Sequence, residues 1–278
     1  MPDSKNSKEF SSLVIIFFTV FLSMLGVTII IPILPAIFVG ETALFSNQFT
    51  EAQSSLLFGG LLISYLLMQF IGAPMLGALS DRIGRKPVLL LSNLGAFLGY
   101  LLFGYSLAQD WLIMLFVSRM IPGFMGGNIA VVLSSIADVS DDDSKTKNFG
   151  LVGAAFGIGF VIGPWIGGEL AEWGTLATPF WFTAFLLFVN LILIHLFYPE
   201  TNFNKVKKEI TPLQAFKNLN KINKIPHLKN VFLVVMLVNL GFAFFTQFFA
   251  LFLYKEFSFS PREAGRLFGW VGLWLAIT

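Results

Sequence analysis

Residues 77–87 read GALSDRIGRKP, and this stretch lies between two long apolar runs. It concentrates an Asp, two Arg and a Lys in a chain that is only 12% charged. Gly84 can adopt the left-handed conformation that ends a helix, and Pro87 suits the first turn of the helix that follows. We therefore interpret the stretch as a tight, charged turn between two helices.

The composition around this turn is that of a membrane protein. The 278 residues are 56% hydrophobic and include 33 Phe, whereas a soluble domain carries about 25% charged residues. A helix needs about 20 apolar residues to cross a bilayer. Seven such runs and the start of an eighth cover residues 12–39, 54–79, 88–108, 111–137, 149–171, 178–198, 230–253 and 263 onward. Because they lack strict alternation, and lipid admits only helices or closed barrels, we predict an all-α, polytopic membrane fold.

The composition also argues against several classes of function. With no Cys and only two His, a disulfide framework, a thiol nucleophile and zinc or haem chemistry are disfavoured. We expect no cofactor and no metal site. The net charge of +2 comes without a basic patch interleaved with aromatics, which argues against nucleic acid. An enzyme within the membrane would need clustered His or carboxylates at depth, and the sequence offers none.

Lysine and arginine gather on one side of the predicted spans. Most of the 18 basic residues lie in the N-terminal tail and in the segments 80–87, 138–148 and 199–229. The positive-inside rule then places these segments in the cytoplasm. We expect a multi-pass protein of the cell membrane. Lys255 and Arg262 are exceptions on the other side. Glu169 and Glu172 also lie on that side, where we expect them to face water.

The chain divides into three parts. Residues 1–198 are predicted to form an N-terminal bundle of six transmembrane helices, residues 199–229 a cytoplasmic linker, and residues 230–278 the start of a C-terminal bundle. In the linker, apolar residues recur at every third position from Leu213 to Ile222. This pattern fits a short amphipathic helix on the membrane surface, and a flexible solvated linker remains the alternative.

The sequence pattern restarts after the linker. At an offset of 210 residues, Thr50 matches Ser260, and Leu57-Phe58-Gly59 match Leu267-Phe268-Gly269. Parallel repeats of this kind build one large class of secondary transporters. The sequence stops inside the apolar run GLWLAIT, so we expect an N-terminal fragment of a twelve-helix protein about 130 residues longer. The last two spans should then lack most of their packing partners.

The charges of the 77–87 turn sit at unfavourable ends of their helices. Arg85 lies at the N-terminus of one predicted helix and Asp138 at the C-terminus of another, where the helix dipole opposes each charge. An Arg85–Asp138 ion pair would relieve both. Asp81 can pair with Arg85 four residues on, or cap a helix from the other half. Spacing alone leaves two interpretations open, a latch that holds one face shut and a loop that only sets topology.

Residues Gly77 to Lys86 resemble, nearly residue for residue, the loop motif of the major facilitator superfamily often called motif A. They also occupy its place, between the second and third spans. The resemblance implies two six-helix bundles that alternate access to the two sides of the membrane. It implies a gating loop formed by Gly77, Asp81, Arg82, Gly84, Arg85 and Lys86, with Asp138 as a partner.

The span 149–171 carries a second motif. Gly159, Gly163 and Gly167 are four apart and lie on one narrow face, which permits close packing against another helix. Pro164 should kink the helix, and Gly150 should point to the opposite side. The set resembles the signature of the superfamily's drug–proton antiporters, which implies export in exchange for protons; its members here are Gly150, Gly159, Gly163, Pro164, Gly167 and Gly168.

Arg119 lies inside the predicted span 111–137, eight residues after Trp111. Intramembrane charge marks a functional site by default, and we favour this interpretation over an arginine that snorkels to the surface. "RMIPGFMGG" from Arg119 resembles the superfamily's motif in this helix, with Pro122 where Gln is common. Other polar side chains in the spans are each explained by an interhelical hydrogen bond. As a set with Arg119 they are our candidate substrate cavity: Ser23, Tyr65, Gln69 and Gln247.

Residues 13–200 as a whole resemble the tetracycline-efflux branch of the superfamily and its multidrug relatives. The tetracycline exporters carry an Asp where this chain has Ser23 and another where it has Gly99, and no acid lies deep in the first six spans here. We predict a monomeric transporter in the lipid bilayer that exports small hydrophobic or amphiphilic compounds, with protons as the coupling ion. The alternatives are a carrier for nutrient uptake and an inactive truncated fragment.

Overall fold

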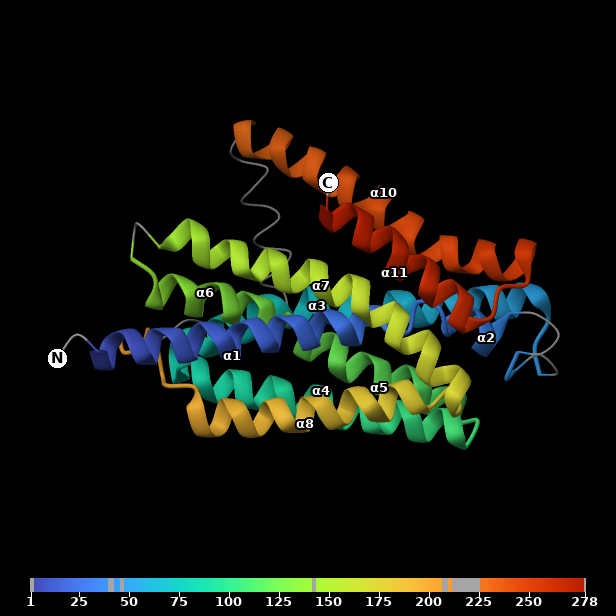
Figure 1. Cartoon of the computed structure of the whole chain (residues 1–278), viewed down its shortest axis with the longest axis horizontal. Coiled ribbons are helices and arrows are strands. Elements are labelled where there is room, and N and C mark those ends of the chain that lie inside the picture. Colours follow the sequence, from blue (N-terminus) through green and yellow to red (C-terminus); the bar gives the residue numbers. More distant parts are fainter. Residues whose placement is uncertain are drawn as a thin grey trace.

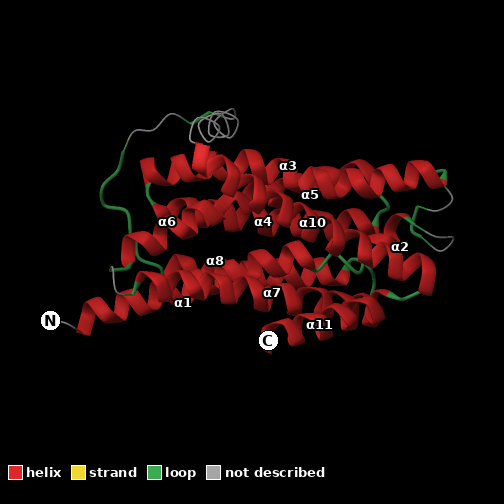
Figure 2. Cartoon of the chain, turned by 90° about the horizontal axis from the view of Figure 1, so that it is seen from above, coloured by secondary structure: helices red, strands yellow, loops and turns green. Residues whose placement is uncertain are grey.

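The computed structural model describes residues 3–39, 43–45, 48–141, 144–206, 210–211 and 226–277, and within these the regular elements are all helices (Figures 1 and 2). The predicted all-α fold is confirmed. The elements in chain order are α1 (Asp3–Thr28), α2 (Leu34–Phe38), α3 (Glu51–Ile83), α4 (Arg85–Ala108), α5 (Leu112–Met125), the 3₁₀ turn η1 (Gly126–Asn128), α6 (Ile129–Val139), α7 (Lys145–Trp173), α8 (Thr178–Phe197), α10 (Pro226–Phe257) and α11 (Pro261–Ile277).

Six stretches are long and apolar enough to cross a membrane: α3, α4, the continuous run from α5 to α6, α7, α8 and α10. The first predicted span, 12–39, is not one helix. The chain turns at residues 29–33, where Ile31 donates to the Thr28 carbonyl and Ile33 to the Ile30 carbonyl, each at 3.0 Å. These short-range bonds replace the α-helical pattern next to Pro32, which has no N–H to donate. The span therefore consists of α1 and the short α2.

The predicted span 111–137 is also interrupted, at η1. A Cβ atom on Gly127 would lie 2.5 Å from the Gly72 carbonyl carbon and 2.7 Å from the Ala73 Cα. The backbones of η1 and α3 therefore touch, and only glycine fits at this point. At η1 the middle of this span therefore packs directly against the backbone of α3.

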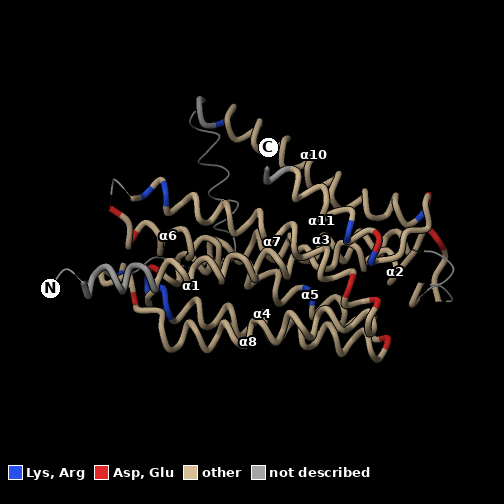
Figure 3. The backbone as a smooth tube through the Cα atoms, viewed as in Figure 1, with Lys and Arg blue, Asp and Glu red and all other residues tan. Residues whose placement is uncertain are grey.

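Charged residues gather at the two ends of the helix bundle, and its middle is almost free of them (Figure 3). We call the end with the 80–87 turn the basic end, and the end with the α4–α5, α7–α8 and α10–α11 turns the opposite end (Figure 1). Two hydrophobic clusters fill the interior. One is built around Ile33, Phe103 and Phe180, and the other around Val88 and Tyr198.

The two last helices differ in how they are packed. The first half of α10 is exposed from Lys229 to Phe245, as expected for a helix without partners. The same expectation is wrong for α11, which lies along α7. A Cβ on Gly265 would collide with the Pro164 carbonyl, and one on Gly272 with the Val161 side chain. Glycines on the facing sides let these two helices approach closely.

The offset repeat predicted from sequence has a structural counterpart in how α3 and α11 begin. Thr50 and Gln53 form a reciprocal capping box at the start of α3. At the start of α11, the Ser260 N–H donates to Glu263 at 2.8 Å, and the Glu263 N–H donates to the Ser260 hydroxyl at 3.3 Å. The same two-way cap therefore opens both helices, 210 residues apart. The predicted amphipathic segment of the linker lies outside the described residues.

Candidate functional site

A cluster of ion pairs at the basic end is centred on Arg85. Its Nη1 lies 2.7 Å from Asp81 Oδ1 and its Nε 2.9 Å from Asp138 Oδ2. Nη1 also donates to the Ser80 hydroxyl at 2.6 Å. The Arg85 side chain is only 7% exposed. The Arg85–Asp138 pair expected from the helix-dipole argument and the Asp81–Arg85 pair expected from the four-residue spacing are both present, and they join the ends of α3, α4 and α6.

The backbone of this turn needs glycine at position 84. Gly84 has φ +117°, a region that L side chains rarely adopt. A Cβ there would also run into the Glu200 carboxylate. The turn is therefore fixed both by its own conformation and by the segment that follows α8.

Glu200 holds the start of α4 in place, and our sequence interpretation missed it. Its carboxylate accepts the backbone N–H of Arg85 at 2.8 Å and of Lys86 at 3.2 Å. It also accepts the N–H groups of Thr201 and Asn202 at 3.0 and 2.9 Å. An anion at a helix N-terminus is favoured by the dipole and by the unpaired N–H groups. Glu200 thus offsets the misplaced cations Arg85 and Lys86.

The segment after Glu200 binds the same turn. The Asn202 side chain donates to the carbonyls of Ser80 and Asp81 at 3.2 and 3.3 Å, and the Val206 N–H donates to the Asp81 carbonyl at 3.0 Å. The described start of the 199–229 segment is therefore attached to the end of α3.

The remaining residues of the predicted gating loop lie outside the ion-pair cluster. Arg82 is exposed. Lys86 donates its Nζ to the His195 carbonyl in α8 at 2.8 Å. Gly77 faces Ala130 of α6, where an added Cβ would make ordinary contact at 3.6 Å. The structure therefore gathers Asp81, Arg85 and Asp138 and leaves the other loop residues around them.

The glycines of α7 place this helix between α1 and α11. A Cβ on Gly159 would lie 2.9 Å from both the Phe21 carbonyl and the Met24 Cβ, and one on Gly167 would run into the Ile29 carbonyl. Gly163 faces Thr28 of α1 in the same way. Gly168 and Pro164 instead meet the start of α11. Gly150 has nothing within 4 Å, so it takes no part in this packing.

At the opposite end, Glu169 of α7 is paired with two arginines of α11. Arg262 Nε lies 3.2 Å from Glu169 Oε2, and Arg266 Nε lies 2.5 Å from Oε1. The Glu169 side chain is 14% exposed, so the expectation that it faces water is wrong. Lys255 likewise pairs with Glu51 of α3 at 3.1 Å. Both cations that break the positive-inside pattern, Arg262 and Lys255, are therefore paired with acids from the first bundle.

We expect Glu169→Gln to destabilise the packing of α11 on α7 by about 1 kcal/mol through the half-buried pair to Arg262. The pair to Arg266, whose side chain is 56% exposed, should add little. Thermal unfolding in detergent, followed by tryptophan fluorescence, measures the change. The effect should shrink in 1 M salt, which screens the pairs in the parent chain. Glu51→Gln is the matched control, because Glu51 is 85% exposed and its pair should contribute little. Equal effects of the two substitutions would contradict the assignment.

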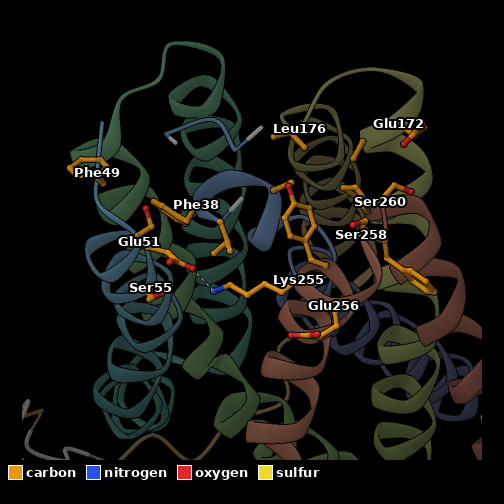
Figure 4. Close-up of a pocket in the computed structure, with 17 residues that line it drawn as sticks. Phe38, Phe49, Glu51, Ser55, Glu172, Leu176, Lys255, Glu256, Ser258 and Ser260 are labelled. Carbon is orange, nitrogen blue, oxygen red and sulfur yellow. Dashed lines mark hydrogen bonds and ion pairs between the residues drawn. The ribbon is translucent and has the colours of Figure 1, made fainter. Parts of the chain in front are cut away.

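A cavity of about 1300 Å³ lies at this same end. Figure 4 shows Glu51, Ser55, Phe38 and Phe49 on one side of it and the α10–α11 turn on the other, with the Lys255–Glu51 ion pair reaching across. Its lining mixes apolar and charged side chains. It is an open vestibule that none of the predicted motif residues lines.

Several predicted cavity residues meet instead in the middle of the bundle. Ser23 and Tyr65 line a small cavity of about 20 Å³ together with Asn93, Tyr100, Gly126 and Asn128. Gln69 donates to the Gly126 carbonyl at 3.3 Å beside it, and the Arg119 guanidinium lies 4.5 Å from the centre of the Tyr65 ring. Gln247 of α10 is not among the residues that line this cavity.

Two positions where the chain departs from the resembling family touch each other. A Cβ on Gly99 of α4 would lie 2.5 Å from Pro122 Cδ and 3.2 Å from the Pro122 backbone nitrogen in α5. The Pro122 ring therefore occupies the space that a side chain at position 99 would need.

Comparisons with known proteins agree with this architecture. The family model of the Major Facilitator Superfamily matches residues 16–278. The class H tetracycline resistance protein of Pasteurella multocida is 40% identical over 193 residues, which cover 68% of this chain and 45% of that protein. The chain thus spans about half the length of the curated relatives it matches.

Solved structures share the fold. The crystal structure of the human organic anion transporter MFSD10 aligns with a TM-score of 0.72 at 24% identity, over 95% of this chain and 70% of that one. The D-xylose-proton symporter aligns with a TM-score of 0.72 at 17% identity, over 96% of this chain and 66% of that one. At these identities the similarity shows the fold.

Proposed function

This chain belongs to the Major Facilitator Superfamily and is an integral membrane protein. On this basis we propose that it is part of a secondary transporter that exports small hydrophobic or amphiphilic compounds. The observation that carries the proposal is the packing of α7. Its glycines touch the backbone of α1 on one side and of α11 on the other. They belong to a pattern that resembles the drug–proton antiporter signature. Relatives that are 35–42% identical are named as tetracycline resistance proteins.

Alternating access needs contacts that can hold each end of the transporter in turn. At the opposite end, α7 and α11 are joined by close glycine packing and by the Glu169 ion pairs. These contacts hold α11 against α7 beside the open vestibule at that end. We propose that the basic end faces the cytoplasm, in line with the positive-inside rule.

The Arg85 cluster then acts at the cytoplasmic end. It ties α3, α4 and α6 into one rigid unit and presents Asp81 and Asp138 at its edge. A rigid unit can rock as a body against the second half. We propose protons as the coupling ion and a monomer as the working form. Every described Asp and Glu lies in a turn or near a helix end, so a proton-binding acid at membrane depth would lie outside the described residues.

We expect cells that express the complete protein carrying this chain to export amphiphilic dyes. The test uses a bacterium without its own efflux pumps and a panel of neutral, cationic and anionic fluorescent dyes, with and without a protonophore. Asp81→Asn should lower export at least tenfold, because it weakens the ion pair to Arg85. Asp110→Asn is the control, since Asp110 lies exposed in the α4–α5 turn.

Either of two results would contradict the proposal. No export of any dye would remove the efflux function, and net uptake would favour a nutrient carrier. Export that persists with the protonophore would leave efflux but exclude coupling to protons.

A further inference from the structure

Arg119 of α5 is a buried cation whose hydrogen-bonding groups are not all used. The residue is 3% exposed. Its Nε and Nη1 atoms are buried and have no hydrogen-bond partner in the structure. None of the ion pairs found among the described residues includes Arg119. About 10 Å of helix separate it from the start of α5, at 1.5 Å per residue.

The aromatic neighbours of Arg119 satisfy only part of its charge. The guanidinium carbon lies 4.5 Å from the centroid of the Tyr65 ring, a cation–π contact. Tyr100 is the second aromatic neighbour of Arg119. A ring face attracts the cation but accepts no in-plane N–H bond, so Nε and Nη1 stay free. Each of these two atoms keeps an N–H group that can donate to an anionic oxygen.

Arg119 adjoins the polar cavity in the middle of the bundle. Tyr65 and Tyr100 contact Arg119 and also line the cavity of about 20 Å³, so the two are neighbours. Ser23, Asn93 and Asn128 supply further polar groups to its wall. At this size the cavity holds about one water molecule. It is too small for a whole amphiphile, and Arg119 lies beside it rather than among the residues that line it.

We propose that Arg119 binds the anionic group, a carboxylate or sulfonate, of an amphiphilic substrate. The proposal rests on the proposed export function and names its substrate class. A buried guanidinium without a counter-charge is costly, and charge kept at membrane depth marks a substrate or ion pathway. A cationic headgroup would be repelled at this point. An acid supplied from outside the described residues is the competing partner, and the experiment separates the two.

The test is binding of a fluorescent naphthyl carboxylate and of its uncharged methyl ester to the purified chain in nanodiscs. We expect the carboxylate to bind at least tenfold more tightly than the ester. Arg119→Gln should weaken the carboxylate at least tenfold and leave the ester unchanged, and Arg119→Lys should keep part of the preference. Lys145→Gln, which removes an exposed charge at the start of α7, should change neither.

The outcomes that would overturn the proposal are equally defined. Equal binding of carboxylate and ester by the parent chain would do so, as would a preference that survives Arg119→Gln and so points to another cation. If sodium chloride alone displaces the carboxylate from the parent chain, the site binds an inorganic anion and the proposed organic anion is wrong. If Arg119→Gln unfolds, the proposal is still tested by comparing carboxylate and ester binding in the parent chain and in Arg119→Lys. Export of a neutral dye would persist in each case, so the efflux proposal stands or falls separately.

Discussion

Gly167→Ala is expected to lower the free energy of unfolding by about 2–3 kcal/mol, because the added methyl group meets a carbonyl that cannot move aside. The obstacle is the Ile29 backbone oxygen at the end of α1, with the Ile29 Cγ1 2.9 Å from the new Cβ. A flexible side chain could swing away from such a methyl group, but here α1 and α7 must separate. Intrinsic fluorescence of the six Trp reports thermal unfolding in detergent, with a midpoint lower by roughly 5 °C.

Gly150→Ala is the matched control on the same helix. Both positions belong to the predicted antiporter pattern, but Gly150 has nothing within 4 Å. Alanine there should be neutral or stabilise by about 0.5–1 kcal/mol, since it restricts the unfolded chain and favours the helix. If the two substitutions have the same effect, α1 and α7 do not meet at Gly167.

Glu200→Ala is expected to cost about 3 kcal/mol, because one carboxylate accepts four backbone N–H groups and bonds to a charged acceptor are the stronger kind. The N–H groups of Arg85 and Lys86 would lose their cap, and the two cations would face an uncompensated helix N-terminus. Export in cells should fall together with thermal stability, because Arg85 is also the centre of the ion-pair cluster.

Two variants make the Glu200 result specific. Glu200→Gln keeps the shape and one acceptor oxygen, so its loss should be intermediate. Glu256→Ala removes an exposed carboxylate at the opposite end and should have little effect. A Glu200→Ala chain as stable as Glu256→Ala would mean that the turn at Gly84 holds itself without the cap.

The sequence predicts features of this molecule that arise from local chemistry. Long apolar runs reveal the helices, and the misfit of Arg85 and Asp138 with their helix dipoles reveals the ion pair between them. The spacing of Gly159, Gly163 and Gly167 likewise reveals one packing face. These three features can be predicted because each depends only on the residues of one helix, or on the position of a charge relative to a predicted helix end.

Features that depend on which distant segments meet could not be read in this way. Glu200 lies 115 residues from Arg85, and the YPET segment gives no local sign that its acid caps α4. Glu169 was misjudged for the same reason, since its partners come from α11. The turn at residues 29–33 had a local sign in Pro32, which the continuous apolar run outweighed in our prediction.

The contact between Gly99 and Pro122 restricts the order in which this sequence can change. An Asp at position 99, as in the resembling tetracycline exporters, would place its Cβ inside the volume of the Pro122 ring. Position 122 must therefore become smaller or more flexible before an acid is tolerated at position 99. We therefore expect the two sites to be epistatic, with a single substitution at position 99 more harmful than the same substitution paired with a change at position 122.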